Sequence, residues 1–165
     1  MLNFFYKIFF SILIKFSFYG KNGDKIRGKI WNIQIKNSGQ NFKVGEGALI
    51  YSPEKLSIGN NVYLGFCSYL GNGTISLDDN VVIGTHVSIA PSNHQRVDNN
   101  YRFSESLYDP ISIGRGTWVC SNVVILAGSK IGSGCVVAAG SVVKGNFPDN
   151  CLITGFPAKI KKFYK

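Results

Sequence analysis

The sequence has 165 residues, enough for one domain that buries about 70% of the surface its unfolded chain exposes. Hydrophobic residues make up 45% of it and charged residues 16%, which excludes an intrinsically disordered chain. The formal net charge of +9 lies at the two ends: residues 1–30 hold six basic residues and one acid, residues 151–165 hold four lysines and no acid, and the stretch between them holds eight of each. A neutral body is unlike a nucleic-acid-binding surface, so we expect no nucleic-acid partner.

The first nineteen residues, MLNFFYKIFFSILIKFSFY, are the most hydrophobic part of the chain. They fit neither a signal peptide nor a spanning helix, because Lys7 and Lys15 interrupt the apolar run and no cleavage site follows. Asn3, Lys7, Ser11 and Lys15 recur at every fourth position, which predicts an amphipathic helix with one polar stripe. Such a helix either lies on a membrane with its lysines toward anionic headgroups or packs on the protein itself, and both interpretations stay open. We assign residues 1–30 to an N-terminal amphipathic and basic segment.

From residue 44 onward, aliphatic residues recur every six positions, with slips of one or two residues. The residue four places after each is often small or β-branched. A helix of period 3.6 cannot hold a six-residue stripe on one face, whereas short strands joined by tight turns can. The aliphatic series is Val44, Ile50, Ile58, Leu64, Leu70, Leu77, Ile83, Ile89, Ile113, Val119, Ile125, Ile131, Val137 and Val143. We therefore predict an all-β solenoid whose repeats bury these residues against the repeats above and below.

Runs of glycine, asparagine and aspartate supply the tight turns, because these residues adopt positive φ at low cost. Examples are Gly59-Asn60-Asn61 and Gly71-Asn72-Gly73. A stack of strands leaves an open edge at each end. We expect the N-terminal segment and the basic C-terminal tail, residues 156–165, to cover these edges of a solenoid domain that spans residues 31–155.

The cysteines and histidines do not form a metal-site pattern. No C-x-x-C spacing occurs, and two histidines are too few for the usual zinc clusters, so the sequence predicts no metal. We expect the cysteines to act as small hydrophobic residues in a reducing compartment, which predicts a cytoplasmic protein. Residues 1–19 leave open that the protein attaches to the inner face of the cytoplasmic membrane. The cysteines and histidines are Cys67, Cys120, Cys135, Cys151, His86 and His94.

The repeats resemble those of the hexapeptide-repeat acyltransferases, whose chain forms a left-handed parallel β-helix with three hexapeptides per coil. The resemblance covers residues 44–160 and implies about five coils. Within that family, the sugar O-acetyltransferases of the maltose, galactoside and colanic-acid type are similar at several further motifs. These are Asn93-His94 before a loop, the stretch DPISIGRGTWVCS at residues 109–121, AAGSVV at 138–143 and GFPAK at 155–159.

The repeat breaks over one long stretch, which predicts a loop, residues 94–110, that projects from a rigid coil. His94 lies where the coil ends, and histidine exchanges protons near neutral pH. An acyl acceptor must lose a proton as it attacks a thioester, so His94 is the candidate general base. Asp98, Glu105 and Asp109 are candidates for a carboxylate that orients it, and the sequence does not choose among them.

The resemblance implies a role for each matching residue. Ser121 corresponds to the residue whose backbone N–H faces the acyl oxygen. Trp118 corresponds to a tryptophan near the acceptor, although packing at a subunit interface stays open; Asn93 and Tyr108 are further substrate-binding candidates. Cys120 replaces the family's usual glycine, and a covalent acetyl-cysteine there is the disfavoured alternative to direct transfer. Lys144-Gly145 stands where the family has Thr-Lys, so the phosphate contacts are less certain. Contacts with coenzyme A are implied for Cys120, Ser121, Ala138, Ala139, Gly140, Lys144 and Lys159.

Together these residues predict an acetyl-CoA-dependent O-acetyltransferase that acts on a sugar hydroxyl. The hydrophobic N-terminus favours an acceptor of bacterial surface-polysaccharide synthesis beside a membrane, either a lipid-linked sugar or a nucleotide sugar. The resemblance implies acetyl-CoA as co-substrate and a homotrimer with active sites between subunits. N-acetylation of an amino-sugar nucleotide or a xenobiotic stays open, as does a non-catalytic scaffold. A β-helical carbonic anhydrase is disfavoured, because that enzyme binds metal through three histidines and only two exist here.

Overall fold

A computed structural model describes residue 14 and residues 20–165 of the chain. The amphipathic helix expected over residues 1–19 therefore lies outside the described residues, with the exception of Ile14, which packs against the hydrophobic core. Within residue 14 and residues 20–165, no helix is long and apolar enough to cross a bilayer.

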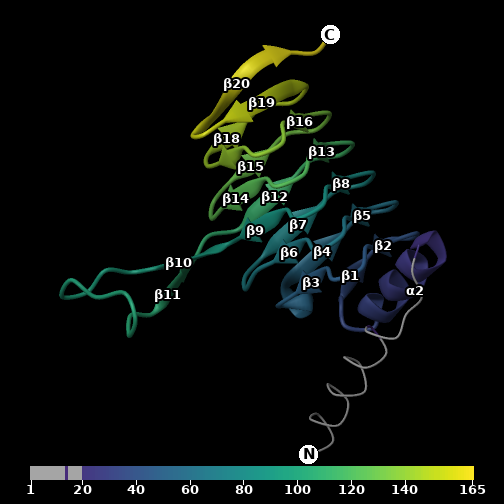
Figure 1. Ribbon diagram of the computed structural model, residues 1–165, viewed down its shortest axis with the longest axis horizontal. Coiled ribbons are helices and arrows are strands. Elements are labelled where there is room, and N and C mark those ends of the chain that lie inside the picture. Colours follow the sequence, from purple (N-terminus) through teal and green to yellow (C-terminus); the bar gives the residue numbers. More distant parts are fainter. Residues whose placement is uncertain (1–13, 15–19) are drawn as a thin grey trace, which may run out of the picture.

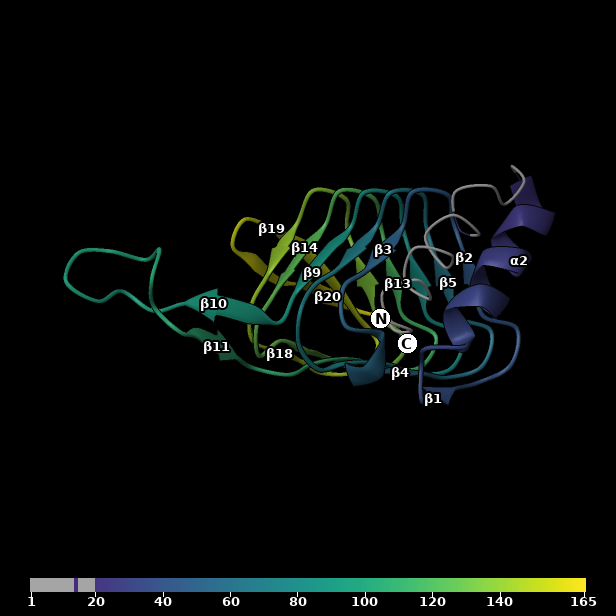
Figure 2. The same cartoon turned by 90° about the horizontal axis from the view of Figure 1, so that it is seen from below.

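The chain winds into a β-solenoid with three parallel sheets as its faces (Figures 1 and 2). The first sheet orders β1 (Asn37–Ser38), β4 (Leu56–Ile58), β7 (Ile75–Leu77), β12 (Ile111–Ile113), β15 (Lys130–Ile131) and β18 (Asn146–Phe147). The second orders β2 (Lys43–Val44), β5 (Tyr63–Leu64), β8 (Val82–Ile83), β13 (Trp118–Val119), β16 (Val136–Val137), β19 (Cys151–Gly155) and β20 (Ala158–Phe163). The third orders β3 (Leu49–Ile50), β6 (Tyr69–Leu70), β9 (Ser88–Ala90), β14 (Val124–Leu126) and β17 (Val142–Val143).

Every aliphatic residue of the predicted series is buried inside the solenoid, which confirms the six-residue rule. Burial removes each large aliphatic side chain from water and stabilises the fold by about 1.5–3 kcal/mol per residue. Several of the small residues four places on are buried as well, among them Thr117 and Ser129, whose hydroxyls are paired. Thr117 Oγ1 donates to the carbonyl of Gly132 (2.7 Å), and Ser129 Oγ donates to the carbonyl of Leu126 (2.6 Å). These two hydroxyls therefore lie in the core with their hydrogen bonds made, whereas the buried Ser68 hydroxyl has no partner among the described residues.

The corners of the solenoid need residues that adopt positive φ. Asn41, Asn61 and Asn80 stack above one another between the first and second sheets, with φ of 57°, 57° and 60°. Asn41 Nδ2 donates to Asn61 Oδ1 (2.9 Å), and Asn61 Nδ2 donates to Asn80 Oδ1 (3.1 Å). Asparagine tolerates this region of φ, and its amide also links successive coils.

The slips in the repeat have structural causes, and the number of coils is larger than expected. The short helix η1 (Pro53–Lys55) accommodates the extra residues before Ile58. The first sheet contains six strands, so the expectation of about five coils was low. The difference arises at the ends, where β1 begins before the first aliphatic residue of the series and β18 and β19 follow the last one.

The helix α2 (Gly20–Asn32) lies against β2 at one end of the solenoid (Figure 1). Its Arg27 is only 2% exposed; Nε donates to the carbonyl of Val44 (2.8 Å), and a terminal nitrogen pairs with Asp24 (2.5 Å). Gly28 lets the helix approach closely, because a Cβ at that position would meet the carbonyl oxygen of Phe42. The buried ion pair and this close contact fix the helix on the first coil.

At the other end, the segment expected as a basic tail contains a strand. β20 pairs antiparallel with β19, with Thr154 opposite Lys159. It covers the edge of the last parallel strand (Figure 1). The lysines of this segment gave no apolar alternation from which a strand could be predicted, and the pairing comes from the available edge of β19.

Candidate active site

The predicted loop is a β-hairpin that leaves the solenoid at the corner between the third and first sheets (Figures 1 and 2). Its strands are β10 (Ser92–His94) and β11 (Ser106–Tyr108), which pair antiparallel with His94 opposite Ser106. The two sides are joined at their base by a hydrogen bond from the Asp109 amide to the Pro91 carbonyl (2.9 Å). His94 is therefore held on a paired strand rather than in an irregular loop, and its side chain is exposed.

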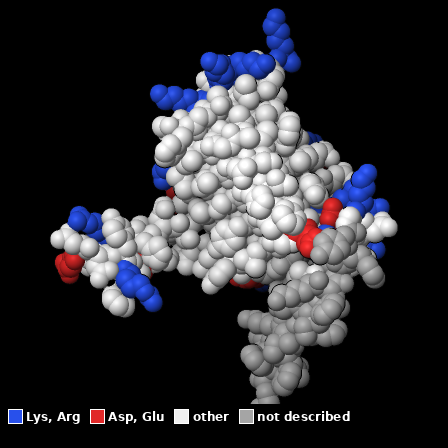
Figure 3. Space-filling model, viewed as in Figure 1, with Lys and Arg blue, Asp and Glu red and all other residues white. Residues whose placement is uncertain are grey.

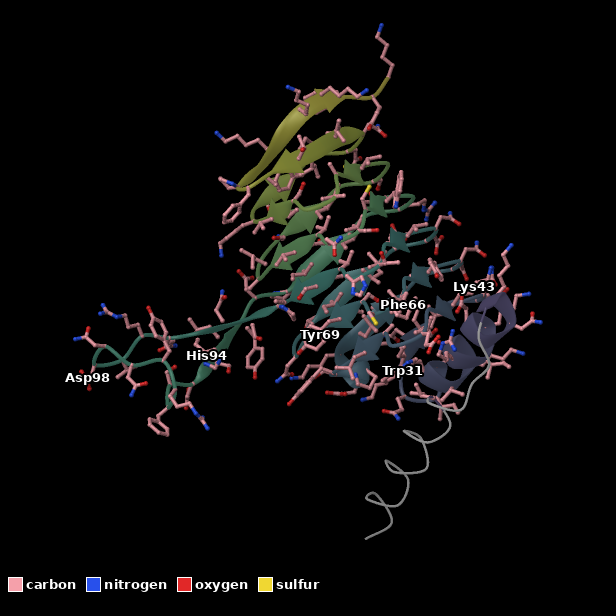
Figure 4. All side chains as sticks on the ribbon, in the orientation of Figure 1. Trp31, Lys43, Phe66, Tyr69, His94 and Asp98 are labelled. Carbon is pink, nitrogen blue, oxygen red and sulfur yellow. The ribbon has the colours of Figure 1, made fainter. Side chains whose placement is uncertain are left out.

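The three candidate carboxylates lie at different heights along this hairpin. Figure 4 shows Asp98 at the far end, away from His94. Glu105 immediately precedes the residue that pairs with His94, and Asp109 lies at the base, where its carboxylate approaches Gly128. In the part of the chain that the structure describes, no carboxylate is within hydrogen-bond distance of His94. His94 is thus exposed, and none of the three candidate carboxylates orients its ring through a hydrogen bond.

A second group of candidates meets at the corner between the second and third sheets, in the turns of residues 84–86, 120–122 and 138–140, which we call the Ser121 corner. Thr85 Oγ1 donates to Ser121 Oγ (2.9 Å), and the Gly140 amide donates to the Ser121 carbonyl (3.1 Å). The Ser121 amide has no acceptor among the described residues. Trp118 lies just before the corner on β13, points outward and is 51% exposed. A backbone N–H without an acceptor is a group that could donate to an acyl oxygen.

The residues implied in coenzyme A binding lie in two places, at the Ser121 corner, where the strands of the third sheet begin, and beyond the end of these strands. Ala139 and Gly140 lie on the next coil of the Ser121 corner and are exposed, and a Cβ on Gly140 would meet nothing within 4 Å. Lys144 follows β17 at the far edge of that sheet, and Lys159 is exposed on β20. Lys and Arg side chains gather at this C-terminal end and over α2 (Figure 3). Of the two candidate lysines, Lys144 lies away from the Ser121 corner.

Within one subunit, His94 and the Ser121 corner do not meet. β9 and β14 are parallel neighbours in the third sheet. Ser121 precedes the start of β14, whereas the hairpin follows the end of β9, so the two lie at opposite ends of this pair of strands. The path from Ser88 to His94 runs through two strands, which at about 3.3 Å per residue is on the order of 20 Å. A site that contains both groups requires a second copy of the chain.

Three other residues that the sequence singled out have contacts of a structural kind. The Tyr108 hydroxyl accepts a hydrogen bond from Asn72 Nδ2 (3.0 Å), and Asn93 is exposed opposite Leu107 in the hairpin. His86 is exposed at a positive φ of 55°, with its ring edge-on to Phe66. The contacts of Thr85 and Asn72 could not be predicted, because they join residues 36 positions apart through loop geometry. Among residues 14 and 20–165, no cluster of three or more His, Cys, Asp or Glu side chains could hold a metal.

The chain is similar in sequence to known transferases. The family described as bacterial transferase hexapeptide (six repeats) matches residues 110–145. Galactoside O-acetyltransferase of Escherichia coli is 33% identical over 71% of this chain and 61% of its own length. A putative lipopolysaccharide biosynthesis O-acetyltransferase of the same organism is 27% identical over 92% of this chain and 79% of its own.

Two solved structures share the fold over 94% of this chain. One is a hexapeptide-repeat acetyltransferase of Vibrio cholerae complexed with acetyl coenzyme A, with a TM-score of 0.84, 25% identity and 84% of that chain covered. The other is a galactoside acetyltransferase in complex with coenzyme A, with a TM-score of 0.82, 25% identity and 79% covered. The chain belongs to the hexapeptide-repeat transferase family. Its fold is the left-handed parallel β-helix of that family, as the resemblance implied.

Cys120 is the position at which this hexapeptide-repeat transferase departs from the expected glycine. Burial raises the pKa of the Cys120 thiol, and a backbone hydrogen bond with Ala139 offsets this only in part. The thiol therefore stays protonated at neutral pH and is a poor nucleophile. We expect Cys120→Ser to retain acetyl transfer within about threefold of the wild-type rate, since a lost general base or oxyanion donor costs at least about 10²-fold. Intact mass spectrometry during turnover checks the same point: an acetylated enzyme that disappears in Cys120→Ser would contradict direct transfer.

Proposed function

We propose that the protein transfers the acetyl group of acetyl-CoA to a sugar hydroxyl. What carries the proposal is one juxtaposition: a solenoid similar to acetyltransferases that hold acetyl-CoA or coenzyme A presents an exposed histidine on a paired strand. The chain spans 61% of the length of the galactoside enzyme it matches.

In the proposed reaction, the acceptor hydroxyl oxygen attacks the thioester carbonyl carbon while His94 takes the hydroxyl proton. The tetrahedral oxyanion receives a hydrogen bond from the free Ser121 amide, in a position where that donor needs no reorganisation. The carbon–sulfur bond then breaks, and the imidazolium returns the proton to the coenzyme A sulfur. Ala138, Ala139 and Gly140 leave room for the pantetheine arm, Lys144 and Lys159 attract its phosphates, and Asn93 and Trp118 border the acceptor.

The site forms between subunits of a homotrimer. The separation of His94 from the Ser121 corner within one chain supports this assembly, because neither group alone provides both a base and an oxyanion donor. The exposed indole of Trp118 and the exposed hairpin would then lie at the contact between two copies.

The acceptor class is tested with the full-length protein, acetyl-CoA and a panel of free sugars, nucleotide sugars, lipid-linked sugars and amino sugars. Release of free thiol that depends on one hydroxyl-bearing acceptor, with a product that loses its acetyl group in mild base, supports O-acetylation. A base-stable product from an amino sugar indicates N-acetylation instead. Absence of acetyl-CoA binding by calorimetry would leave a non-catalytic solenoid.

We further propose that residues 1–19 attach the protein to the inner face of the cytoplasmic membrane, in keeping with an acceptor used in surface-polysaccharide synthesis. The support is the stripe of Asn3, Lys7, Ser11 and Lys15 in an otherwise apolar segment. Each lysine near an anionic surface contributes about 1 kcal/mol, so replacing Lys7 and Lys15 by glutamine should weaken binding to phosphatidylserine vesicles about 30-fold.

Co-flotation with vesicles measures this binding, and Lys161→Gln with Lys162→Gln is the matched pair of charge removals at the opposite end. Equal loss in both double variants would assign the binding to net charge rather than to residues 1–19. Unchanged flotation of Lys7→Gln with Lys15→Gln would contradict the proposal.

A further inference from the structure

The side chain of Tyr108 attaches the base of the hairpin to the solenoid. Tyr108 is the last residue of β11 and pairs with Ser92, the first residue of β10. Its hydroxyl accepts a hydrogen bond from Asn72 Nδ2 (3.0 Å). Asn72 Oδ1 in turn accepts from Oγ of Ser52, which is buried (2.7 Å). The hairpin is thus linked through two hydrogen bonds to a residue that cannot move without disturbing the core.

The ring of Tyr108 is held on two sides as well. Lys55 Nζ lies 5.2 Å from the ring centroid, within the range of a cation–π contact. On another side, the ring and Pro91 pack against Gly73, where an added Cβ would lie 3.3 Å from Tyr108 Cδ1 and 2.9 Å from Pro91 Cγ. Gly73 also has a φ of +137°, so no other residue fits there without strain.

The rest of the hairpin offers no comparable attachment. Across the described residues, the Asn72–Tyr108 bond is the only side-chain hydrogen bond between β10 or β11 and the solenoid. Phe103 near the far end is 86% exposed, and the side-chain hydrogen bonds of that region are internal, as between Arg96 and Asn99. The direction of the hairpin is therefore set at its base.

The extra residue between Leu70 and Leu77 makes room for the turn that contains Asn72. Leu70 and Leu77 are seven residues apart instead of six, and Gly71-Asn72-Gly73 occupies the added turn. This turn puts the Asn72 amide beneath the hairpin and leaves a glycine surface for Pro91 and Tyr108.

We propose that Tyr108, clamped by Asn72 and Lys55, is a positioning residue that aims the hairpin and so fixes the imidazole of His94. The inference rests on the proposed function, in which His94 is the base. His94 lies two residues beyond Ser92, the direct partner of Tyr108, so rotation at the base displaces the imidazole. Misplacement of a reacting group by about 1 Å can cost about 10²-fold in rate. In this role Tyr108 acts through His94 and needs no contact with the acceptor or the thioester.

The first test compares Tyr108→Phe with Tyr101→Phe. Both tyrosines are in or beside the hairpin and about half exposed (51% and 54%), but the structure gives the Tyr101 hydroxyl no partner among the described residues. Loss of one hydrogen bond should raise amide hydrogen exchange across β10 and β11 roughly fivefold in Tyr108→Phe and leave it unchanged in Tyr101→Phe. The clamp predicts a fall in kcat of about five- to thirtyfold with KM for acetyl-CoA unchanged, since coenzyme contacts remain.

The second test is a double-mutant cycle with rescue. Asn72→Leu should match Tyr108→Phe in exchange and in kcat, and the double variant should lose no more than either single variant. Asn72→Asp retains an acceptor for Ser52 and for the Tyr108 hydroxyl, which can then act as donor, so it should restore most of the protection and rate.

These readouts separate the clamp from the proposed function. Increased exchange confined to the hairpin, in a protein with no acetyl transfer, would retain the clamp as an attachment and remove its catalytic purpose together with the proposed function. Additive losses in the cycle, or Tyr108→Phe behaving like Tyr101→Phe, would overturn the clamp while leaving acetyl transfer intact. A rise in KM for acetyl-CoA with kcat unchanged would reassign Tyr108 to coenzyme binding.

Discussion

Replacement of His94 by alanine should lower acetyl transfer by about 10²–10⁴-fold, the usual contribution of a positioned general base. In the proposed reaction the imidazole accepts the hydroxyl proton, and no carboxylate among the described residues lies within hydrogen-bond distance of it. The side chain is exposed on a short strand, so its removal creates no cavity in the core. Steady-state thiol release from acetyl-CoA measures the effect, with circular dichroism as the check that the solenoid is retained.

The control for this variant is the other histidine. His86 is also exposed, but it lies in a turn of the solenoid at φ 55°, so His86→Asn preserves the backbone conformation that the turn requires. We expect that variant to retain most of its activity. If His94→Ala turns over at a rate close to wild type, the base must be sought elsewhere, and the hairpin loses its proposed role.

The solenoid could be predicted because its core repeats in register. Each coil places the same kind of side chain at the same point, as where Ile83 pairs with both Leu64 and Val119 on the second sheet. A single aliphatic residue carries little information, but a stack of them obeys one geometric rule that the sequence displays directly. The turns could be predicted equally well from their asparagines, because few residue types adopt positive φ at low cost.

The contacts at the ends of the solenoid and in the hairpin were harder to predict, because each of them occurs once and is not repeated along the chain. Arg27 joins a helix to the first coil through the carbonyl of Val44, and nothing in a basic N-terminal segment distinguishes it from exposed lysines. Tyr108 matched the expected acceptor region by its place in the chain, yet its hydroxyl bonds Asn72. Such pairings depend on the path of a loop, which residue types alone do not determine.

The candidate site was predictable as a set of residues but not as an assembled whole. The motifs identified His94 and the corner around Ser121, and one subunit holds them at opposite edges of the third sheet. The distance between them is a consequence of the triangular coil, since a strand must separate two corners. This geometry leads to a prediction that does not depend on the identity of the acceptor.

Two inactive variants should restore each other when they share a trimer. His94→Ala removes the base, and Ala139→Trp places an indole at the exposed Ser121 corner, where it should block the pantetheine arm without touching the core. Each variant alone should lose at least about 10²-fold in rate. A site is intact when one subunit supplies His94 and its neighbour supplies an open corner. Each mixed trimer has one such site of its three, so about a third of the wild-type activity should return in purified mixed trimers.

Co-expression of the two variants with different affinity tags, followed by sequential purification, isolates the mixed trimers for this measurement. Separately purified homotrimers, combined under conditions that prevent subunit exchange, provide the control and should stay inactive. If the base and the acyl site belonged to the same subunit, every subunit would carry one of the two inactivating substitutions in its own site. Co-expression would then restore no activity. Full activity from a wild-type monomer in sedimentation experiments would refute the shared site by a separate route, because the solenoid of one chain keeps His94 and the Ser121 amide on different corners.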